Sequence, residues 1–502
     1  MSEYQTSFIV RFCDNLFDDK PHDDDLFIDS ESFKLSYSNL FKYICLFSDH
    51  TCFRENNSFY LSSKCSYVNI VSLVIAFSLG LNLKIINDKD NEIANQSFDL
   101  EAYLSPFLAN QDFDIFTFDC SLIRARQIFE QNCSRFSLTL FTSGSTSAPK
   151  PVTHPFSSLA YQAVSVSEAL SLRNTDRQLA YMPISYIYGF SILTTALYSR
   201  SCLAISSFDL NEPDSFFRQL YALDITVFSG IPYVYNLIYS KLGFSIFNTS
   251  GLRILTQAGG PLKPNLKQEI LKQCPNINFW IMYGQTEFGG RISQFNLTDS
   301  PTMINSVGVP LPGTLAYISS VEESSFEGNQ FEGDIYISSP SFSDSYSKKL
   351  DTKVIDGIYY YATGDIGYIS EGYLFVTGRN RSFLKIAGKR INVKSIQDKI
   401  SEINGIDDCF LFYVDRKYPT FLIGLVTNSF DNSLAQAELK SILISAYRSD
   451  NTLVNDLQRV PFFTYVIKGD LPLLPNSKLN LAKLEEIISN HHYEKKSVHI
   501  RL

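Results

Sequence analysis

Residues Leu140–Pro151 read LFTSGSTSAPKP, a composition unlike that of an ordinary connection between two structural elements. Five hydroxyl side chains and one glycine fill Thr142–Ser147, and Lys150 follows between two prolines. In an irregular turn such residues expose backbone N–H groups and side-chain donors together, while the lysine adds a positive charge. We therefore interpret the stretch as a loop that holds anionic oxygens, such as those of a phosphate. The alternative is a flexible surface loop rich in serine and glycine.

The residues after this loop argue against the P-loop type of phosphate site. A Walker A loop, GxxxxGK[ST], runs directly into a helix. Here Pro149, Pro151 and Pro155 keep the following segment extended. The sequence therefore disfavours kinase-type and P-loop ATPase sites.

The first 300 residues alternate short apolar runs with amphipathic segments, which indicates an α/β fold. Arg135–Phe141 is predicted to be a strand that ends at the loop, and Ser157–Leu172 a helix. Three later segments each run from an apolar strand into a turn: Leu223–Ile238, Leu252–Leu262 and Ile277–Glu287. Ligands of open α/β sheets bind outside the carboxyl ends of the strands, so all four turns are expected to converge on one crevice.

The chain is expected to contain more than one domain, because 502 residues exceed the roughly 250–300 that one hydrophobic core serves. After about residue 300, strand-like runs such as Gly333–Ser339 and Gly372–Gly378 predict a β-rich subdomain. Beyond Arg379 the αβ alternation resumes. We predict a large domain over residues 1–379, a hinge at 380–382 and a small domain over 383–502.

Composition excludes several classes of function. A formal net charge of −9 offers no electrostatic footprint for nucleic acid or an anionic membrane. The apolar window Val68–Ile86 breaks at Gly80, so it predicts a buried helix feeding a short strand, not an integral membrane segment. Nine scattered cysteines without CxxC spacing suggest neither a disulfide framework nor a zinc site. Since Met1–Val10 also lacks a secretory pattern, a cytoplasmic location is expected.

A second constellation is MYGQTEFGG, Met282–Gly290, at the end of a predicted strand. Tyr283 offers a flat face for a base, Thr286 a hydroxyl for a phosphate and Glu287 a carboxylate for Mg²⁺. The alternative is a surface turn with an ordinary exposed glutamate.

Two further segments carry candidate residues. In the first, Asp365 and Arg379 each follow a Thr-Gly turn, so the carboxylate can accept both ribose hydroxyls and the arginine can fix the sugar. The alternative is a β-hairpin with a surface ion pair. In the second, Lys478 lies in a proline-flanked loop ahead of a helix, where a lone lysine is ordinarily a solubility residue.

Together these segments resemble the motifs of the adenylate-forming superfamily, which includes acyl-CoA synthetases, peptide-synthetase adenylation domains and luciferases. The resemblance spans roughly residues 60 to 487, in the family's order and spacing. The motifs are TSGSTSAPK, PISYIYGF, FSGIPYVY, TQAGGPL, MYGQTE, SVGVPLPG, TGD followed by GR, and LPLLPNSK. It implies an α/β fold in which the large domain combines two αβ subdomains with a β-rich subdomain, and a small mobile α+β domain follows.

The resemblance also implies a two-step reaction with ATP and Mg²⁺. A carboxylic acid attacks the α-phosphate of ATP, giving an acyl-adenylate and pyrophosphate, and a pantetheine thiol then takes the acyl group. CoA is the favoured acceptor, with phosphopantetheine on an acyl carrier protein as the second choice. Nucleic acid is not an expected partner.

The family's roles are carried onto matching positions of this chain. Lys478 would bridge the attacking carboxylate and the α-phosphate, Thr286 would touch that phosphate, and Glu287 would hold Mg²⁺. Asp365 and Arg379 would hold the ribose. The expected nucleotide-binding residues are Thr142, Ser143, Gly144, Ser145, Thr146, Lys150, Tyr283, Gly284 and Gln285, with the tyrosine stacking on adenine.

The acid itself is expected to be a fatty or aryl acid. Tyr186 stands where many acyl-CoA and aryl-CoA synthetases have histidine, and no neighbouring aspartate is present to hold the ammonium of an α-amino acid. An apolar or aromatic-lined pocket is predicted. Its predicted residues are Tyr186, Phe190, Ala258, Gly259 and Gly260. The alternative is that these aromatics belong to the core.

Three positions depart from the family pattern. Ser147 and Ser477 replace glycines, and either would be strained if its site required positive φ. Arg381 stands at a hinge position that is often aspartate. Two other functions therefore stay open: an amino-acid adenylation module, or a catalytically silent nucleotide-binding homologue.

Overall fold

The structure is a computed structural model. It describes residues 3–18, 25–30, 33–48, 50–55, 58–86, 97–109, 121–142, 150–206, 212–248, 251–320, 332–379, 383–386, 389–392, 396–397, 400, 406, 408–414, 420–426, 462–468, 472, 481–493 and 499–501.

The largest sheet has nine strands, and its central strands run parallel. Parallel strands end at the same edge, so the turns after β10, β11 and β12 lie side by side. In spatial order the strands are β14 (Val309–Pro310), β13 (Ser293–Asn296), β12 (Asn278–Tyr283), β11 (Ile254–Gln257), β10 (Val227–Gly230), β8 (Arg177–Ala180), β9 (Cys202–Ile205), β1 (Leu26–Asp29) and β2 (Lys34–Ser36).

The loop quoted first belongs to a different, five-stranded sheet. Strands β6 and β7 form an antiparallel hairpin in which Thr142 pairs with Lys150, and residues 143–149, outside the described residues, join them. The order of this sheet is β5 (Phe98–Asp99), β3 (Phe59–Ser62), β4 (Asn82–Ile86), β6 (Ser137–Thr142) and β7 (Lys150–Pro155).

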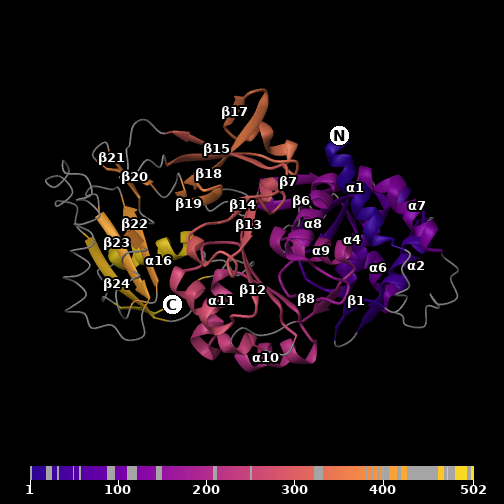
Figure 1. Ribbon diagram of the computed structural model, residues 1–502, viewed down its shortest axis with the longest axis horizontal. Coiled ribbons are helices and arrows are strands. Elements are labelled where there is room, and N and C mark those ends of the chain that lie inside the picture. Colours follow the sequence, from indigo (N-terminus) through magenta and orange to yellow (C-terminus); the bar gives the residue numbers. More distant parts are fainter. Residues whose placement is uncertain are drawn as a thin grey trace.

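Helices α8 and α9 are buried along nearly their whole length, and α1 packs against both of them (Figure 1). The same core contains α4, which is apolar all round. The α-helices of this part are α1 (Glu3–Leu16), α2 (Tyr37–Phe47), α3 (Cys52–Glu55), α4 (Tyr67–Leu79), α6 (Leu100–Ala109), α7 (Leu122–Asn132), α8 (Phe156–Leu170), α9 (Ile187–Ser199), α10 (Pro213–Ala222), α11 (Pro232–Leu242) and α12 (Pro264–Gln273). Short 3₁₀ turns are η1 (Cys133–Arg135), η2 (Phe244–Phe247), η3 (Thr286–Phe288), η4 (Pro301–Met303) and η5 (Asp344–Lys349).

The apolar window Val68–Ile86 folds as the sequence predicts. Helix α4 ends at Gly80, which adopts φ +68°, and β4 follows directly as an inner strand of the five-stranded sheet. In the parts of the chain described here, no helix combines the length and apolar character that crossing a bilayer requires.

A β-rich unit follows, as expected from the sequence after residue 300. Its core includes Val152 of β7 together with Phe288 and Ile292, which follow the Tyr-Gly-Gln-Thr-Glu corner in the chain. The unit therefore packs directly on the segments that carry the first two motifs. Its strands are β15 (Leu315–Ser320), β16 (Gly333–Ser338), β17 (Thr352–Ile355), β18 (Ile358–Ser370) and β19 (Tyr373–Arg379).

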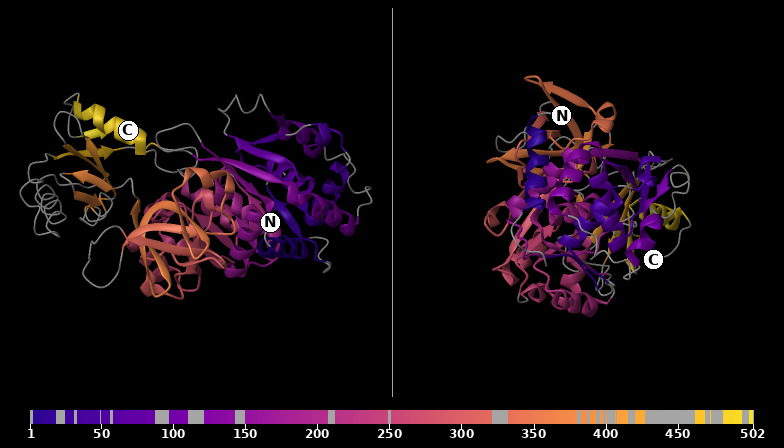
Figure 2. Two further views of the ribbon diagram at one scale, coloured as in Figure 1. Left: turned by 90° about the horizontal axis from the view of Figure 1, so that it is seen from above. Right: turned by 90° about the vertical axis from the view of Figure 1, so that its right-hand side faces the viewer.

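The C-terminal elements gather at one end of the molecule (Figures 1 and 2). They comprise the hairpin β20 (Phe383–Ile386) and β21 (Lys389–Asn392), the sheet strands β22 (Asp408–Val414), β23 (Thr420–Val426), β24 (Phe462–Lys468) and β25 (His499–Arg501), and α16 (Leu481–Tyr493). These have a separate apolar cluster that joins Leu422 and Ile467 of the sheet to Leu484 and Ile488 of α16. The boundary at 380–382 lies outside the described residues and stays a prediction.

Seven of the described cysteines form no disulfide. The cysteines without a disulfide are Cys13, Cys52, Cys65, Cys133, Cys202, Cys274 and Cys409. Cys45 is disulfide-bonded, which departs from the expectation drawn from the cysteine spacing.

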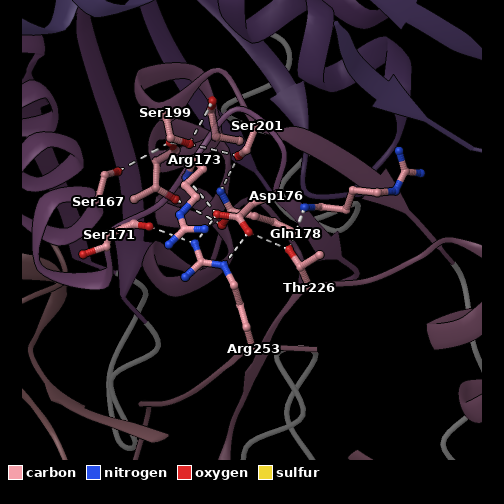
Figure 3. Close-up of polar contacts among 12 residues, drawn as sticks. Ser167, Ser171, Arg173, Asp176, Gln178, Ser199, Ser201, Thr226 and Arg253 are labelled. Atoms are coloured by element: carbon pink, nitrogen blue, oxygen red, sulfur yellow. Dashed lines mark hydrogen bonds and ion pairs between the residues drawn. The ribbon is translucent and has the colours of Figure 1, made fainter. Parts of the chain in front are cut away.

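A buried polar cluster joins the amino ends of the parallel strands, opposite the motif-bearing turns (Figure 3). Asp176, 2% exposed, accepts hydrogen bonds from Arg253 Nε at 2.7 Å and from Thr226 Oγ1 at 2.8 Å. Its other oxygen accepts the Arg173 amide at 2.7 Å. The cluster ties together the starts of β8, β10 and β11.

We predict that Asp176→Ala lowers the free energy of unfolding by about 3 kcal/mol, because it leaves a largely buried guanidinium without its partner. Urea unfolding of the variant measures this. The control is Asp14→Ala, which breaks an exposed ion pair with Arg126 and is expected to cost less than about 1 kcal/mol. Equal losses in the two variants would contradict the role given to the buried cluster.

Candidate active site

The phosphate-type loop is the connection of a β-hairpin, not the entry to a helix. The chain leaves the loop into β7, and α8 begins only at Phe156, after Pro155. The exclusion of a Walker A site is therefore confirmed. Of the predicted loop residues, Thr142 and Lys150 are described and pair across the hairpin, while Ser143, Gly144, Ser145, Thr146 and the departure Ser147 lie outside the described residues.

The Tyr-Gly-Gln-Thr-Glu corner is a tight turn at the carboxyl end of β12. Strand β12 ends at Tyr283, and the 3₁₀ turn η3 begins at Thr286. A Cβ atom on Gly284 would lie 2.0 Å from the carbonyl oxygen of Gly290, so only glycine allows the two backbone segments to approach. The turn thereby presents Gln285, Thr286 and Glu287 in sequence.

Two side chains fasten the hairpin to this corner. The Nε2–H group of His154, on β7, donates to the carbonyl oxygen of Thr286 at 2.7 Å. Ser343 bridges from the β-rich unit, since its amide donates to Glu287 O at 2.9 Å and its hydroxyl to Thr153 O at 2.7 Å. These contacts hold β7, the strand that follows the loop, against the corner, whereas the convergence of the loop itself with the corner stays a prediction because residues 143–149 lie outside the described residues.

Asp365 is the centre of the third motif, and it is buried, with 2% exposure. Its Oδ2 accepts hydrogen bonds from Tyr283 Oη at 2.6 Å and from Gln285 Nε2 at 2.7 Å. Its Oδ1 accepts one from Arg379 Nε at 2.8 Å. The ion pair of the alternative interpretation is present across the β18–β19 hairpin, but its carboxylate is buried. The hydrogen bonds from Tyr283 and Gln285 connect this carboxylate to the end of β12 in the nine-stranded sheet.

Electrostatics connect these groups. Burial raises the pKa of Glu287, while the positive charges of Arg379 and Lys150 oppose that rise. Burial and the neighbouring carboxylate of Asp365 raise the pKa of Tyr283 far above its ordinary value, so this phenol stays protonated and donates. The charge of Asp365 raises the pKa of Arg379. Lys150 and Glu287 therefore share one electrostatic environment with Asp365.

The residues predicted to bind the acid differ in solvent exposure. Tyr186 is partly exposed, and a Cβ atom on Gly259 would lie 2.3 Å from its hydroxyl oxygen, so this side chain covers the turn after β11. Gly259 and Gly260 are exposed, whereas Ala258 is buried. Phe190 is 1% exposed and packs near Phe77, as the core alternative describes.

Three of the predicted residues are not described by the structure, and two residues that contact the corner were not predicted from the sequence. Lys478, Ser477 and Arg381 lie outside the described residues. Sequence reasoning missed His154 and Ser343, because a histidine within a strand and a serine in a loop give no signal of a contact with a distant corner.

Comparison with known proteins relates part of this chain to a family. Residues 109–347 match the family model described as "AMP-binding enzyme". The match covers a little under half of the chain. This range contains the hairpin loop and the Tyr-Gly-Gln-Thr-Glu corner, so the resemblance to adenylate-forming enzymes is confirmed.

Curated relatives of this chain include 2-succinylbenzoate–CoA ligase from Oceanobacillus iheyensis, 26% identical over 352 residues, covering 68% of this chain and 71% of the relative. Malonate–CoA ligase from Arabidopsis thaliana is 28% identical over 298 residues, which is 54% of this chain and 47% of that protein. The chain thus matches about half the length of some curated relatives.

Solved structures establish the fold. The o-succinylbenzoate CoA synthetase MenE from Bacillus subtilis, in complex with the acyl-adenylate OSB-AMP, matches with a TM-score of 0.69 at 16% identity, covering 95% of this chain and 98% of that one. ATP-bound MatB from Rhodopseudomonas palustris gives a TM-score of 0.72 at 17% identity, with 97% and 99% covered. The predicted fold class, a large N-terminal domain and a smaller C-terminal one, is confirmed.

We predict that the burial of His154 makes the fold sensitive to acid. Burial lowers the pKa of His154 from 6.5 to about 4. The unfolded chain therefore binds the proton more readily, and stability, constant above about pH 6.5, falls as the pH drops toward 4, by on the order of 3 kcal/mol.

Thermal midpoints of the wild type and of His154→Gln, measured between pH 7 and pH 4.5, test this. Glutamine can still donate to Thr286 but does not titrate, so the variant is expected to lose less stability over this range. Parallel pH profiles for the two proteins would contradict the assignment.

Proposed function

We propose that this protein is an ATP-dependent acid–thiol ligase of the AMP-forming type. A carboxylate oxygen bonds to the α-phosphorus of ATP as pyrophosphate leaves, and a thiol then attacks the acyl carbon of the adenylate as AMP leaves. The observation that carries the proposal is the buried Asp365, held by Tyr283, Gln285 and Arg379 beside Glu287.

Asp365 suits the ribose of ATP. A carboxylate has about four acceptor positions, and the present hydrogen bonds use three of them. One position is open to a hydroxyl donor, and binding both ribose hydroxyls requires one present contact to give way. Arg379, with a side chain 67% exposed, is the partner best able to move.

Glu287 suits Mg²⁺ that arrives with the nucleotide. Among the described residues, no three His, Cys, Asp or Glu side chains gather as a metal site. Mg²⁺ is commonly held by one or two carboxylates together with substrate phosphates. Glu287 supplies such a carboxylate, while Lys150 and the hairpin loop take the β- and γ-phosphates.

Lys478 would assist the first step. Carboxylate and phosphate repel each other, and negative charge concentrates at the phosphorus in the transition state. An ammonium held between them opposes the repulsion and orients the attack. We assign Lys478 to a small domain, residues 383–502, that turns about the hinge at 380–382 and so serves the first step alone.

The acid is a fatty or aryl carboxylic acid, and CoA is the preferred acceptor. Curated relatives of this chain act on 2-succinylbenzoate and malonate with CoA, which supports a CoA ligase over an amino-acid adenylation module. Tyr186, over the turn at Gly259, gives the acid an aromatic contact.

The cytoplasm is the proposed compartment, because seven described cysteines form no disulfide. The disulfide at Cys45 is the feature that argues against it, and cell fractionation is the direct test.

We predict pyrophosphate release that depends on ATP, Mg²⁺ and a carboxylic acid. A panel of fatty, aryl and amino acids, assayed with and without CoA, identifies the acid and the acceptor. Thioester is expected only when CoA is added. Release with amino acids alone would favour the adenylation module, and nucleotide binding without any acid-dependent release would favour a silent homologue.

We predict that Asp365→Asn weakens ATP binding by about 10- to 100-fold, because hydrogen bonds to a charged group contribute roughly 1.5–3 kcal/mol. Calorimetric titration with MgATP measures the loss. Asp351→Asn is the matched control, since Asp351 also accepts a tyrosine hydroxyl at 2.6 Å, from Tyr336 on the same sheet. Equal affinity in the two variants would remove Asp365 from the nucleotide site.

A further inference from the structure

Arg291 is a charged side chain buried directly behind the active-site corner. It follows Gly290 in the turn that carries Thr286 and Glu287, and it is 2% exposed. Its Nη1 group donates to Gly290 O at 2.8 Å, its Nη2 group to Ser191 Oγ at 3.3 Å, and its Nε–H points at the sulfur of Met282 at 3.1 Å.

The contacts of Arg291 with the described residues compensate its charge only in part. All three acceptors are neutral, one is a weakly accepting thioether, and three hydrogen bonds use only part of the five N–H donors of a guanidinium. In the part of the chain that the structure describes, no carboxylate pairs with Arg291, and the ionisable groups that act on it are Tyr188 and Tyr186. Buried charges are ordinarily paired, because an unpaired one costs several kcal/mol.

The charge of Arg291 lies close to residues that we assign to binding of the acid. The guanidinium lies 4.4 Å from the ring centre of Tyr188, and the ring of Tyr188 lies 6.2 Å from that of Tyr186. Tyr186 in turn covers Gly259, the turn assigned to the acid. The charge of Arg291 opposes the rise in the pKa of Tyr186 that burial causes, so its field reaches that side chain.

The surrounding backbone adds to the positive potential. Helix α9 begins at Ile187 with no side-chain cap at Tyr186, so its partly positive end faces the same region. Gly290, at φ +106°, lets the turn press against this helix end, where a Cβ atom would lie 2.9 Å from Ile187 Cγ1. The fold thus places two sources of positive potential behind Tyr186.

We propose that Arg291 is a specificity-determining residue and that the acid carries a second anionic group, such as a second carboxylate, at the end remote from the reacting one. This rests on the proposed function and narrows it. An alkyl chain would leave the guanidinium unpaired, whereas an anion beyond Tyr186 compensates it. Tyr186, the partly exposed member of the group, is the side chain that the incoming acid meets first.

The test compares matched acids that differ in the second carboxylate, such as hexanoate with adipate and phenylacetate with phenylenediacetate. The wild type is expected to favour the diacid in kcat/KM by at least tenfold. Arg291→Met keeps the length of the side chain without its charge and is expected to lose that preference while retaining turnover of monoacids. Arg291→Lys keeps the charge and is expected to retain part of it.

Arg253→Met is the matched control, because this arginine is also poorly exposed but pairs with Asp176 at the opposite end of the strands. It is expected to lower stability and leave the diacid preference unchanged. Thermal melts of each variant, with and without adipate, supply a readout independent of turnover, and stabilisation by adipate is expected to require Arg291 or its lysine replacement.

The outcomes separate the two proposals. A wild type that favours monoacids, or an Arg291→Met variant that loses turnover of both acids equally, overturns the role of Arg291 and leaves the ligase intact. Absence of pyrophosphate release with every acid overturns the ligase. Even then, stabilisation by adipate that Arg291→Met abolishes would support the anion site, and its absence would overturn it.

Discussion

The site depends on one buried carboxylate, that of Asp365. Tyr283 and Gln285 reach it from the corner after β12, and Arg379 reaches it from β19 of the β-rich sheet. A buried carboxylate is costly unless donors surround it, so these contacts fix the corner relative to the β-rich unit. A carboxylate that already accepts hydroxyl and N–H donors is also one that a sugar hydroxyl can join.

The hairpin of β6 and β7 is held at the same corner by different contacts. Because β7 belongs to the five-stranded sheet, its strand pairing does not determine its position relative to the corner after β12. The contact of His154 with Thr286, and the bridge through Ser343, supply the missing relation. Both lie at the backbone of the corner, which leaves the side chains of Thr286 and Glu287 available for a ligand.

The two buried charged side chains next to the corner, Asp365 and Arg291, differ in their hydrogen-bond partners. Asp365 is surrounded by donors, one of them cationic, whereas Arg291 has neutral acceptors and the face of Tyr188. A protein that spends stability on an incompletely compensated charge commonly does so for a ligand, and perturbed ionisable groups gather at functional sites for this reason. The nucleotide would then be held by a buried carboxylate that donors of the protein already surround. The acid would be held by a buried arginine that has no anionic partner among the described residues.

The sequence by itself determined the class of the fold and the chemistry of most motifs. Periodicity and glycine positions predicted α4 ending at Gly80, the strands β6, β10, β11 and β12, and the β-rich unit after residue 300, because these features depend on residues close in the chain. The prolines after the hydroxyl-rich loop were enough to exclude a helix there.

Only the tertiary structure decided which distant residues touch. The pairing of Tyr283 with Asp365 spans 82 positions, that of His154 with Thr286 spans 132, and the hidden charge of Arg291 depends on a helix 100 positions away. Such contacts follow from how whole sheets pack. A local pattern cannot encode them, since the same histidine or arginine elsewhere in a strand or turn would be solvated or conventionally paired.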